Sequence, residues 1–584
     1  MIVLGLNAYH GDSAACLVRD GRLIAAAEEE RFRRVKHWAG LPTEAVRYCL
    51  EEAGAGLADI SYVAINSDPH ANFWHKTWFA LTHRPDPRLI WSRLTNQRRR
   101  VSVEEALRAA FPDSAYAGGV HFVEHHLAHL ASAFLVSPFE EAVTVSVDGF
   151  GDFASAAWGS GHGARINVDG KVHFPHSLGI FYQAMTQYLG FPHYGDEYKV
   201  MGLAPYGEPR YLPQMRNIVC LQEDGTFWLN LDYFRHHREK VEYTWNNGEP
   251  SVGRLYSTAL EAEFGPSRGK HEALTQHHKD LARSVQAMYE EAFFHLLNSL
   301  HARYRLDTLS LAGGCAMNSV ANGKIYRNTP FKQVYIQSAA GDAGGAIGAA
   351  MILWHQMNGG ARRNSIMDHA YWGPQFNEEQ ISGLLGVKNE EIQGRGCRVE
   401  RIIDEDDLCR RTAGSIAEGR VVGWFQGRME WGPRALGNRS ILCDPRRADM
   451  KDILNIKIKR RESFRPFAPS VLREAVSEWF ETDDDVPFMM QVFQIKEKRR
   501  ALIPAVTHVD GSGRLQTVHR DTNPRYYRLI EKFYDLTGVP MLLNTSFNEN
   551  EPVVCRPEEA LDCFLRTKMD VLVMGNWVVT RNNG

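Results

Sequence analysis

The stretch from residue 125 to residue 152 constrains the fold of this chain more than any other. Leu127, Leu130 and Phe134 recur at helical spacing, so residues 125–134 are expected to form a helix. A Ser-Pro turn follows, and the β-branched run at residues 142–147 is expected to form a buried strand. Asp148 comes directly after that strand. The stretch is therefore a helix-turn-strand unit, which indicates an α/β fold.

Two histidines of this helix are candidate metal ligands. His125 and His129 are four residues apart, so their Cβ atoms would lie about 5–6 Å apart on one helix face. This separation suits two imidazoles on one metal ion, and the carboxylate of Asp148 can reach the same ion. A histidine pair is more often an ordinary surface or core pair, and Asp-Gly after a strand is more often a hairpin turn. The occurrence of both in one unit favours a site, and Asp342, at the start of a later expected helix, is either an N-cap or a further ligand.

Composition excludes several classes of protein. The 584 residues carry 67 basic and 70 acidic side chains, so no overall field favours nucleic acid or a membrane surface. Nine cysteines without a C-x-x-C pair make a disulfide framework or a cysteine zinc site unexpected, which fits a reducing cytoplasm. The N-terminus lacks the basic region of a signal peptide, and no window approaches the roughly 20 apolar residues of a membrane helix. A soluble, cytoplasmic protein is predicted.

Glycine-rich turns after strands are candidate nucleotide-binding elements. The first contains Gly149, Gly151 and Asp152, and the second contains Gly313 and Gly314. Asn318 and Asn322 follow the second turn at the expected start of a helix, whose N–H groups suit an anion, and they complete the candidate set. The glycines at residues 341–348 do not have the spacing of a dinucleotide fingerprint, so that interpretation is rejected.

Two similar strand-turn-strand openings suggest an internal duplication. Strands are expected at residues 2–7, 14–18 and 23–27, and a comparable series recurs within residues 143–173. Duplicated α/β halves of this kind enclose a nucleotide in the actin, sugar-kinase and heat-shock ATPase class. Between the two openings, the basic run at residues 97–100 is more typical of a solvated helix face than of an acceptor pocket.

The C-terminal part of the chain concentrates basic side chains beside Gly-Pro turns. The glycine-rich, charged stretch 357–370 is the best linker candidate. Three segments beyond it, residues 427–440, 457–467 and 544–548, combine arginine and lysine with serine and asparagine. Guanidinium groups bind phosphate and carboxylate oxygens bidentately, although surface salt bridges would give a similar composition.

Seven motifs in order along the chain resemble the NodU/CmcH family of O-carbamoyltransferases. They are GLNAYH at residues 5–10, EEERF at 28–32, HHLAH at 125–129, KVMGLAPYG at 199–207, GGC at 313–315, GPRALG at 432–437 and NTSFN at 544–548. So many ordered matches over the whole length make the resemblance specific.

The resemblance implies an α/β chain of two domains. Residues 1–356 would form a duplicated domain similar to actin, heat-shock ATPases and the universal threonylcarbamoyl-transfer protein. After the linker, residues 371–584 would form an α/β domain similar to threonylcarbamoyl-adenylate synthase (YrdC). The second domain would make carbamoyl-adenylate from carbamoyl phosphate and ATP with Mg(II). The first would transfer the carbamoyl group to a hydroxyl of a small-molecule acceptor, a natural product such as an antibiotic or a sugar.

The resemblance also implies roles for particular residues. The metal ligands would be His125, His129, Asp148 and Asp342, usually holding iron(II), with Mn(II) or Zn(II) as alternatives. The carbamoyl phosphate contacts would be Arg434, Lys459, Arg465, Arg514, Ser546 and Asn548. His10 matches the N-terminal histidine of the family and is the candidate to accept the proton of the acceptor hydroxyl. Asp12 and Lys199 complete the candidate catalytic set, with Asp12 orienting His10, contacting phosphate or capping a turn.

Two other functions remain open from the sequence. A tRNA threonylcarbamoylation enzyme has both domain types, but the GPRALG motif and the near-neutral charge disfavour it. A nucleotide-dependent binding module would not need the basic cluster of the C-terminal part. The expected partners are therefore the acceptor, carbamoyl phosphate and ATP, without nucleic acid or membrane, and homodimerisation is left open.

Overall fold

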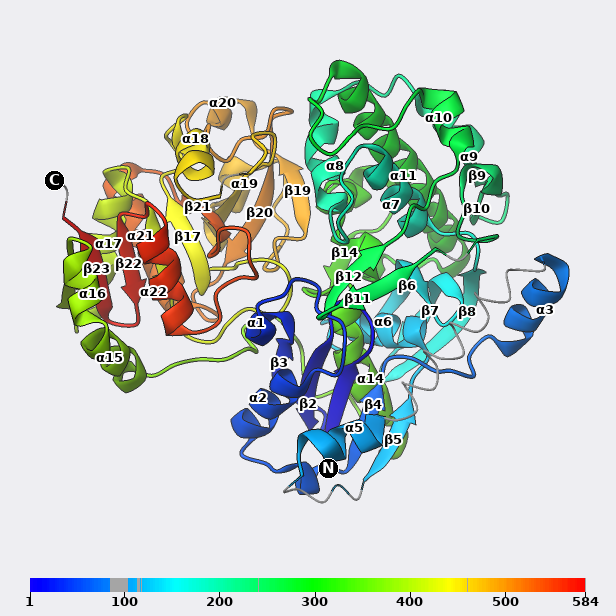
Figure 1. Ribbon diagram of the computed structural model, residues 1–584, viewed down its shortest axis with the longest axis horizontal. Coiled ribbons are helices and arrows are strands. Elements are labelled where there is room, and N and C mark those ends of the chain that lie inside the picture. The colour runs from blue at the N-terminus through cyan, green and yellow to red at the C-terminus, as the bar shows by residue number, and fades with distance from the viewer. Residues whose placement is uncertain (84–102, 113–115, 117, 240, 460, 583–584) are drawn as a thin grey trace. The chain divides into compact units, whose positions relative to one another are not determined.

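The computed structural model describes residues 1–83, 103–112, 116, 118–239, 241–459 and 461–582. The chain divides into two compact units, Met1–Met367 and Asp368–Gly584 (Figure 1). The boundary falls inside the stretch predicted as a linker, residues 357–370. The basic run at residues 97–100 lies outside the described residues. Among the helices that the structure describes, none is both long and apolar enough to cross a membrane.

The first unit contains the same five-stranded topology twice. In each copy the first three strands pair antiparallel, and the fourth and fifth strands are added parallel beside the first. One sheet has the order β3 (Arg22–Glu28), β2 (Ala14–Arg19), β1 (Ile2–Asn7), β4 (Tyr62–Ile65), β5 (Gly119–Phe122). The other has the order β8 (Arg165–His173), β7 (Ala154–His162), β6 (Glu141–Gly151), β13 (Thr308–Ala312), β14 (Gln333–Ile336). This repeat confirms the duplicated, ATPase-like fold class expected from the sequence.

Two helices at the centre of the first unit bring the sheets together. α6 (His125–Phe134) packs on β6 and β13, while α14 (Asp342–Met357) packs on β1 and β2. The two helices also pack on each other so closely that a Cβ atom on Gly348 would lie 1.7 Å from the carbonyl oxygen of Ala128. The glycines at the start of α14 therefore serve close packing, because any side chain at residue 348 would collide with α6.

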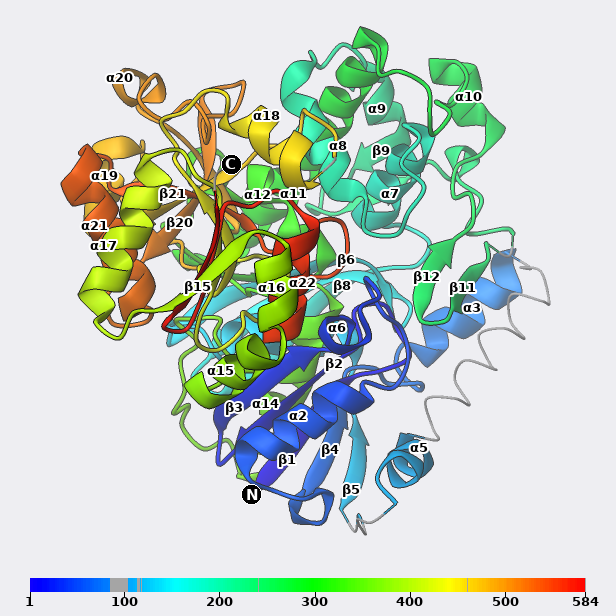
Figure 2. The same ribbon diagram turned by 60° about the vertical axis from the view of Figure 1, so that its left-hand side comes forward.

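Other helices cover the remaining faces of the first unit. α2 (Thr43–Ala53) lies on the face of the first sheet where Leu4 and Leu6 enter the hydrophobic core (Figure 2). Its remaining helices are α1 (Glu30–Arg33), α3 (Phe73–His83), α5 (Val103–Ala110), α7 (Leu178–Tyr188), α8 (Glu197–Leu203), α9 (Leu212–Ile218), α10 (Thr258–Phe264), α11 (Gln276–Tyr304), α12 (Ser319–Asn322) and α13 (Ile325–Asn328). Two small hairpins pair β9 (Val219–Leu221) with β10 (Phe227–Leu229) and β11 (Tyr243–Asn246) with β12 (Glu249–Val252).

The second unit is a mixed α/β layer structure. Its nine strands run in the order β15 (Cys397–Arg401), β23 (Trp577–Arg581), β22 (Val571–Met574), β16 (Val422–Phe425), β17 (Arg439–Cys443), β21 (Met541–Ser546), β18 (Ala468–Leu472), β20 (Ser512–Val518), β19 (Gln491–Gln494). Its helices are α15 (Glu378–Val387), α16 (Asn389–Gly394), α17 (Glu405–Ala417), α18 (Met450–Leu454), α19 (Val476–Trp479), α20 (Glu497–Arg500), α21 (Pro524–Thr537) and α22 (Pro557–Arg566). The C-terminal α/β domain expected from the sequence is therefore confirmed as a fold class.

The structure differs from the sequence expectation at the end of β6. The sequence pattern placed a turn directly after residue 147, but the strand continues to Gly151. Its pairing with β7 shifts register between Val147 and Gly151, which marks a bulge. The bulge lets the strand continue past Asp148 and places the actual turn at Asp152 and Phe153, both with positive φ.

Candidate active site

Four side chains of the first unit converge at the start of α6. His125 Nε2 lies 3.0 Å from His129 Nε2 and 3.1 Å from Asp148 Oδ2. Both imidazole nitrogens lie 3.5 Å from Asp342 Oδ1. One potential ligand atom from each residue falls within 4.8 Å of the others, and all four residues are buried. The helix, the second sheet and α14 thus bring together the four predicted metal ligands.

The backbone around β6 holds this arrangement in place. Asp152 accepts a hydrogen bond at 2.9 Å from the backbone N–H of His125, which fixes the first residue of α6. Asp148 Oδ1 accepts a hydrogen bond at 2.9 Å from the N–H of Gly314, which leaves Oδ2 facing the histidines. Asp342 is the first residue of α14 and the N-cap position is occupied by Gly341, so the N-cap alternative is not what the structure shows.

The donor set fits a divalent transition metal. Two imidazoles and two carboxylates suit Fe(II), Mn(II) and Zn(II), and buried carboxylates that face each other need a cation to offset their repulsion. When no ion is bound, protonation of His129 supplies part of that charge, and an incoming ion would displace the proton. Burial opposes this protonation, but the hydrogen bonds that His129 donates to Asp148 and Asp342 raise the pKa of His129 to about 9. Against the opposing effect of burial, the nearby histidines hold the pKa of both carboxyl groups below its usual range.

The three predicted catalytic residues have different surroundings. His10 Nδ1 pairs with Asp342 Oδ2, so His10 stands directly beside the predicted metal ligands. Asp12 pairs instead with His37, whose Nδ1 lies 2.7 Å from Asp12 Oδ1. Lys199, in α8, forms an ion pair of 2.9 Å with Asp196. His10 therefore contacts a predicted metal ligand, whereas Asp12 and Lys199 pair with residues outside the ligand set.

The predicted nucleotide residues at the end of β6 differ from one another. A Cβ atom on Gly149 would meet nothing within 4 Å, so this position leaves room for a ligand. A Cβ atom on Gly151 would lie 2.0 Å from the ring of His125, so this glycine is required by the histidine. The carboxylate of Asp152 also accepts hydrogen bonds from Ser67 Oγ at 2.8 Å and from the N–H of Asp68 at 2.7 Å. Asp152 thus ties together three backbone segments.

The predicted nucleotide residues after β13 are engaged by the protein itself. Gly313 has a φ of 91°, and a Cβ atom there would lie 2.2 Å from the carbonyl oxygen of Val147. Asn318 exchanges two hydrogen bonds with Gln286 of α11, at 3.0 and 3.1 Å. Asn322 is fully buried and donates to the carbonyl of Ala316 at 2.6 Å. These contacts stabilise the segment beside the metal ligands, and a nucleotide role for it stays a prediction.

The second unit gathers the predicted carbamoyl phosphate residues into one cationic cluster. Burial and then the charge of Arg465 lower the pKa of Arg434 to about 10. Burial, followed by the charges of Arg434, Arg461 and Arg465, holds the pKa of Arg514 well below its usual range. Neither Arg434 nor Arg514 has a carboxylate partner among the residues that the structure describes. Arg465 is the member with a carboxylate nearby, since its guanidinium lies 3.6 Å from Glu462. Guanidinium groups that lack such partners are suited to an oxyanion, so the carbamoyl phosphate role of the cluster stays a prediction.

Lys459 connects this cluster to the turn after β21. Its ammonium group donates to Asn548 Oδ1 at 2.7 Å, to the carbonyl of Asn548 at 2.8 Å and to the carbonyl of Ser546 at 2.5 Å. Burial, and then the charge of Arg461, holds the pKa of Lys459 well below its usual value. Because these bonds use its three N–H groups, Lys459 fixes the positions of Ser546 and Asn548.

Sequence reasoning gave no role to several residues that shape these sites. Glu430 Oε1 accepts hydrogen bonds from the N–H groups of Leu436 and Asn438, both at 2.8 Å, and so holds the turn that carries Arg434. Arg461 belongs to the cationic cluster, and its place beside Lys459 in a basic run was the available signal. His37 had no local signal, because only the fold brings it to Asp12.

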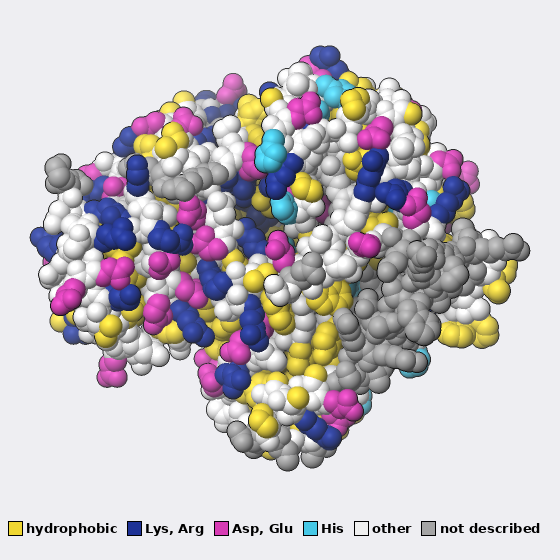
Figure 3. Space-filling model, viewed as in Figure 1, with side chains coloured by type: hydrophobic (Ala, Val, Ile, Leu, Met, Phe, Trp, Pro, Cys, Tyr) yellow, Lys and Arg dark blue, Asp and Glu magenta, His cyan; other side chains and the backbone are white. Residues whose placement is uncertain are grey.

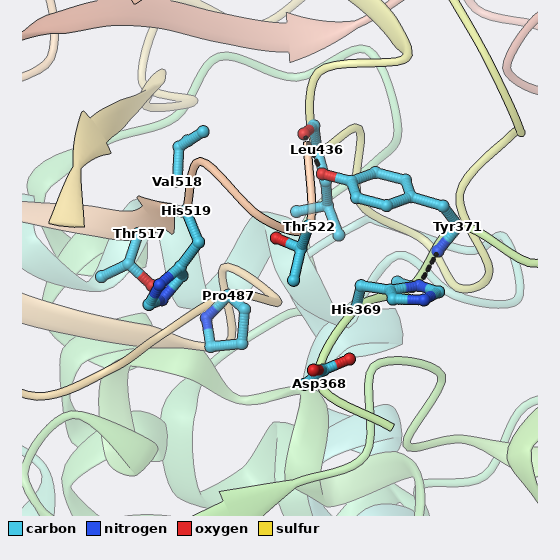
Figure 4. A pocket seen from close by; sticks show the side chains of 10 residues that line it. Asp368, His369, Tyr371, Leu436, Pro487, Thr517, Val518, His519 and Thr522 are labelled. Carbon is cyan, nitrogen blue, oxygen red and sulfur yellow. Dashed lines mark hydrogen bonds between the residues drawn. The ribbon is translucent and has the colours of Figure 1, made fainter. Parts of the chain in front are cut away.

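A cavity elsewhere in the second unit is too small for the expected ligands, carbamoyl phosphate and ATP. It is lined by Asp368, His369, Tyr371, His519 and neighbours, and its volume is about 10 Å³ (Figure 4). The N–H of Tyr371 donates to His369 Nδ1 at 3.2 Å, and its hydroxyl donates to the carbonyl of Leu436 at 3.0 Å. This volume suffices for about one water molecule. On the face that Figure 3 shows, acidic and basic side chains are interspersed, in keeping with the near-neutral composition.

The comparison with known families decides the class of the protein. Residues 2–351 match the family model of the carbamoyltransferase N-terminus, and residues 413–581 match that of the carbamoyltransferase C-terminus. The chain belongs to the carbamoyltransferase family. This finding confirms the family and the enzyme class expected from the sequence motifs.

Three relatives of this carbamoyltransferase match over different shares of their lengths. A Synechocystis sp. protein is 41% identical over 614 residues, covering 99% of this chain and 96% of that one. The nodulation protein NolNO of Sinorhizobium fredii is 39% identical over 586 residues, which cover 98% of this chain and 80% of that protein. The 3′-hydroxymethylcephem-O-carbamoyltransferase of Amycolatopsis lactamdurans is 35% identical over 271 residues, which cover 46% of this chain and 48% of that enzyme.

Proposed function

We propose that this carbamoyltransferase forms carbamoyl-adenylate from carbamoyl phosphate and ATP in its second unit and transfers the carbamoyl group to a hydroxyl in its first unit. The observation that carries the proposal is the cationic cluster of Arg434, Arg465 and Arg514. Two of these guanidinium groups lack a carboxylate partner among the described residues, and their charges repel each other. Phosphate groups would relieve this repulsion and accept the guanidinium N–H groups bidentately.

The proposed donor reaction consumes both substrates in the second unit. Carbamoyl phosphate and water give carbamate and phosphate. A carbamate oxygen then attacks the α-phosphorus of ATP, with Mg(II) on the triphosphate, and pyrophosphate leaves. The cationic cluster offsets the negative charge that develops on the phosphoryl oxygens. Ser546 and Asn548, fixed by Lys459, are placed beside that cluster and can hydrogen-bond the carbamoyl group.

The proposed transfer reaction uses the first unit. His125, His129, Asp148 and Asp342 would hold the metal, with iron(II) as the expected ion. When bound, the metal supplies Lewis-acid polarisation and charge stabilisation. Asp342 accepts the Nδ1 proton of His10, which fixes the imidazole tautomer and leaves Nε2 to accept the proton of the acceptor hydroxyl. The hydroxyl oxygen then bonds to the carbamoyl carbon, and AMP leaves.

The relatives support a small-molecule acceptor. The cephem enzymes of Amycolatopsis lactamdurans and Streptomyces clavuligerus are named for O-carbamoylation of a hydroxymethyl group. By analogy, we propose that this chain modifies a natural product or a sugar in the cytoplasm.

A pyrophosphate-release assay without acceptor tests the donor reaction. Wild-type protein is given ATP, Mg(II) and carbamoyl phosphate, and is compared with Arg465→Ala and His129→Ala. The proposal predicts release that requires carbamoyl phosphate, is abolished by Arg465→Ala and is at least partly retained by His129→Ala. Arg447→Ala is the matched control, because Arg447 forms an exposed ion pair of 2.6 Å with Asp449. Formation of ADP regardless of carbamoyl phosphate would instead favour a nucleotide-dependent binding module.

A further inference from the structure

A network of uncharged polar side chains crosses the sheet of the second unit. Gln516 of β20 and Asn544 of β21 reach each other across Ser470 of the intervening strand β18. Ser470 Oγ donates to Gln516 Oε1 at 2.5 Å, and Asn544 Nδ2 lies 3.0 Å from Ser470 Oγ and 3.2 Å from Gln516 Oε1. The three residues are no more than 2% exposed, so water does not compete for these hydrogen bonds.

The network shares one face of the sheet with two of the predicted carbamoyl phosphate contacts. Side chains two residues apart in a strand point to the same face. Arg514 precedes Gln516 by two residues in β20, and Ser546 follows Asn544 by two residues in β21. The hydrogen bonds across β18 place Gln516 and Asn544 on the same face. Arg514 and Ser546 therefore lie on that face as well.

The two amide side chains hold the backbone turn that carries Arg434. Gln516 Nε2 donates to the carbonyl of Leu436 at 2.9 Å, and Asn544 Nδ2 donates to the carbonyl of Ala435 at 3.0 Å. Ala435 and Leu436 are the two residues directly after Arg434. Because a buried carbonyl that loses its donor is costly, these bonds keep the turn on the sheet.

Glu430 and Tyr371 also contact this turn, but from a different direction. Glu430 Oε1 accepts from the N–H of Leu436, and the Tyr371 hydroxyl donates to the carbonyl of Leu436 at 3.0 Å. Tyr371 and Glu430 pair with each other in a bridge outside the named strands. They therefore hold the shape of the turn, whereas Gln516 and Asn544 tie it to the strands of the predicted phosphate contacts.

The turn has to stay in place against electrostatic repulsion. Burial, and then the charge of Arg434, holds the pKa of Arg514 well below its usual range, so the two guanidinium groups are close enough to repel each other. This repulsion acts to move the turn away from the sheet. The amide and hydroxyl groups of the network carry no charge, so they hold the turn without neutralising either arginine. A carboxylate in their place would pair with a guanidinium and compete with phosphate.

We propose that Gln516 and Asn544 are positioning residues for the donor reaction, which hold Arg434 close to Arg514 so that both guanidinium groups bind the same carbamoyl phosphate. They do not touch the substrate and act through the two backbone carbonyls that follow Arg434. This inference rests on the proposed donor reaction. Loss of either amide lets the turn move, and a misplacement of about 1 Å can cost on the order of a hundredfold in catalytic efficiency.

Pyrophosphate release without acceptor, at varied carbamoyl phosphate and saturating ATP, tests the two amides. Gln516→Met and Asn544→Leu remove the donors and nearly conserve the side-chain volume. We expect each variant to raise the KM for carbamoyl phosphate at least about tenfold, with a smaller change in kcat. Gln426→Met is the matched control, because this buried glutamine of the same unit contacts Gly575 at 3.3 Å and Arg525 at 2.8 Å. It should leave the KM for carbamoyl phosphate unchanged.

A second comparison shows whether Gln516 acts through Arg434. The Kd of carbamoyl phosphate is measured by titration calorimetry for Gln516→Met, Arg434→Ala and the double variant. Gln516→Met should weaken binding at least about tenfold in the wild-type background and add little to Arg434→Ala, because the placement of an absent guanidinium has no effect. Equal losses in the two backgrounds would contradict the proposal.

Urea denaturation of the same variants separates positioning from stability. A lower free energy of unfolding with an unchanged KM in both Gln516→Met and Asn544→Leu would refute the positioning role, while release by wild-type protein would leave the donor reaction standing. Measuring both variants guards against misfolding of one. Wild-type protein that releases no pyrophosphate with carbamoyl phosphate and ATP would refute the proposed function and this inference with it.

Discussion

Replacing Gly151 with alanine should disable the predicted metal site without touching a ligand. The new Cβ atom would lie 2.0 Å from the His125 ring, whereas ordinary contact begins at 3.4 Å, so one group must move by about 1.4 Å. The ring is the more mobile partner, because it can rotate about its side-chain bonds whereas Gly151 is held in register with Ala154 of β7. Metal-ligand distances tolerate changes of only about 0.2 Å. The alanine should therefore remove His125 from the ligand set.

The expected loss of metal affinity is at least about tenfold and up to about a hundredfold, as for changes that misorient a ligand. Overpacking should also lower the free energy of unfolding by about 1–3 kcal/mol. Cobalt(II) titration of the chelator-treated protein, followed by absorption spectroscopy, measures the affinity directly. Gly149→Ala is the matched control two residues away, because its Cβ atom would meet nothing within 4 Å.

The result that would refute this reasoning is equal cobalt affinity in Gly151→Ala and wild type. It would mean that the backbone of the bulge yields while His125 stays in place, or that His125 is not a ligand. A loss of affinity in Gly149→Ala as large as in Gly151→Ala would also contradict it. That outcome would indicate a general weakening of the strand, because only Gly151 touches the histidine.

Three further predictions concern other parts of the chain. Glu430→Ala leaves the N–H groups of Leu436 and Asn438 without their acceptor. Urea denaturation should therefore show a free energy of unfolding lower by about 2–4 kcal/mol, and pyrophosphate release should fall as well. An unchanged free energy of unfolding would contradict this. The pKa of His37 is raised, so its pair with Asp12 stabilises the fold fully below about pH 6.5, and this contribution disappears as pH rises through about 9. The stability difference between wild type and His37→Gln should therefore shrink from pH 6 to pH 10, by at most about 1.4 kcal/mol per pH unit, and a constant difference would disprove it. Removal of the metal with a chelator should abolish carbamoyl transfer, and added iron(II) should restore it. Pyrophosphate release should persist at least in part without the metal. Carbamoyl transfer that survives full metal removal would exclude a metal role.

Local patterns in the sequence were sufficient for the elements and the fold class. The hairpin signals around residues 14–27 and the apolar run at residues 142–147 each lie within one contiguous segment, so neighbouring residues encode them. Their repetition predicted the duplication that the two sheets confirm. The spacing of His125 and His129 likewise predicted a shared helix face, because the period of a helix is fixed by its backbone.

The roles of individual side chains depended on contacts between distant segments. Asp342 reaches the histidines because α14 packs against α6, and no pattern near residue 342 distinguishes a ligand from an N-cap. The sequence left three roles open for Asp12, and the fold pairs it with His37 across a different segment. Gly151 and Asp152 resembled a phosphate-binding turn, but the bulge in β6 places one against His125 and uses the other to fix α6. Sequence determines elements through short-range periodicity, whereas a site is decided by strand register and helix packing, which only the complete tertiary structure sets.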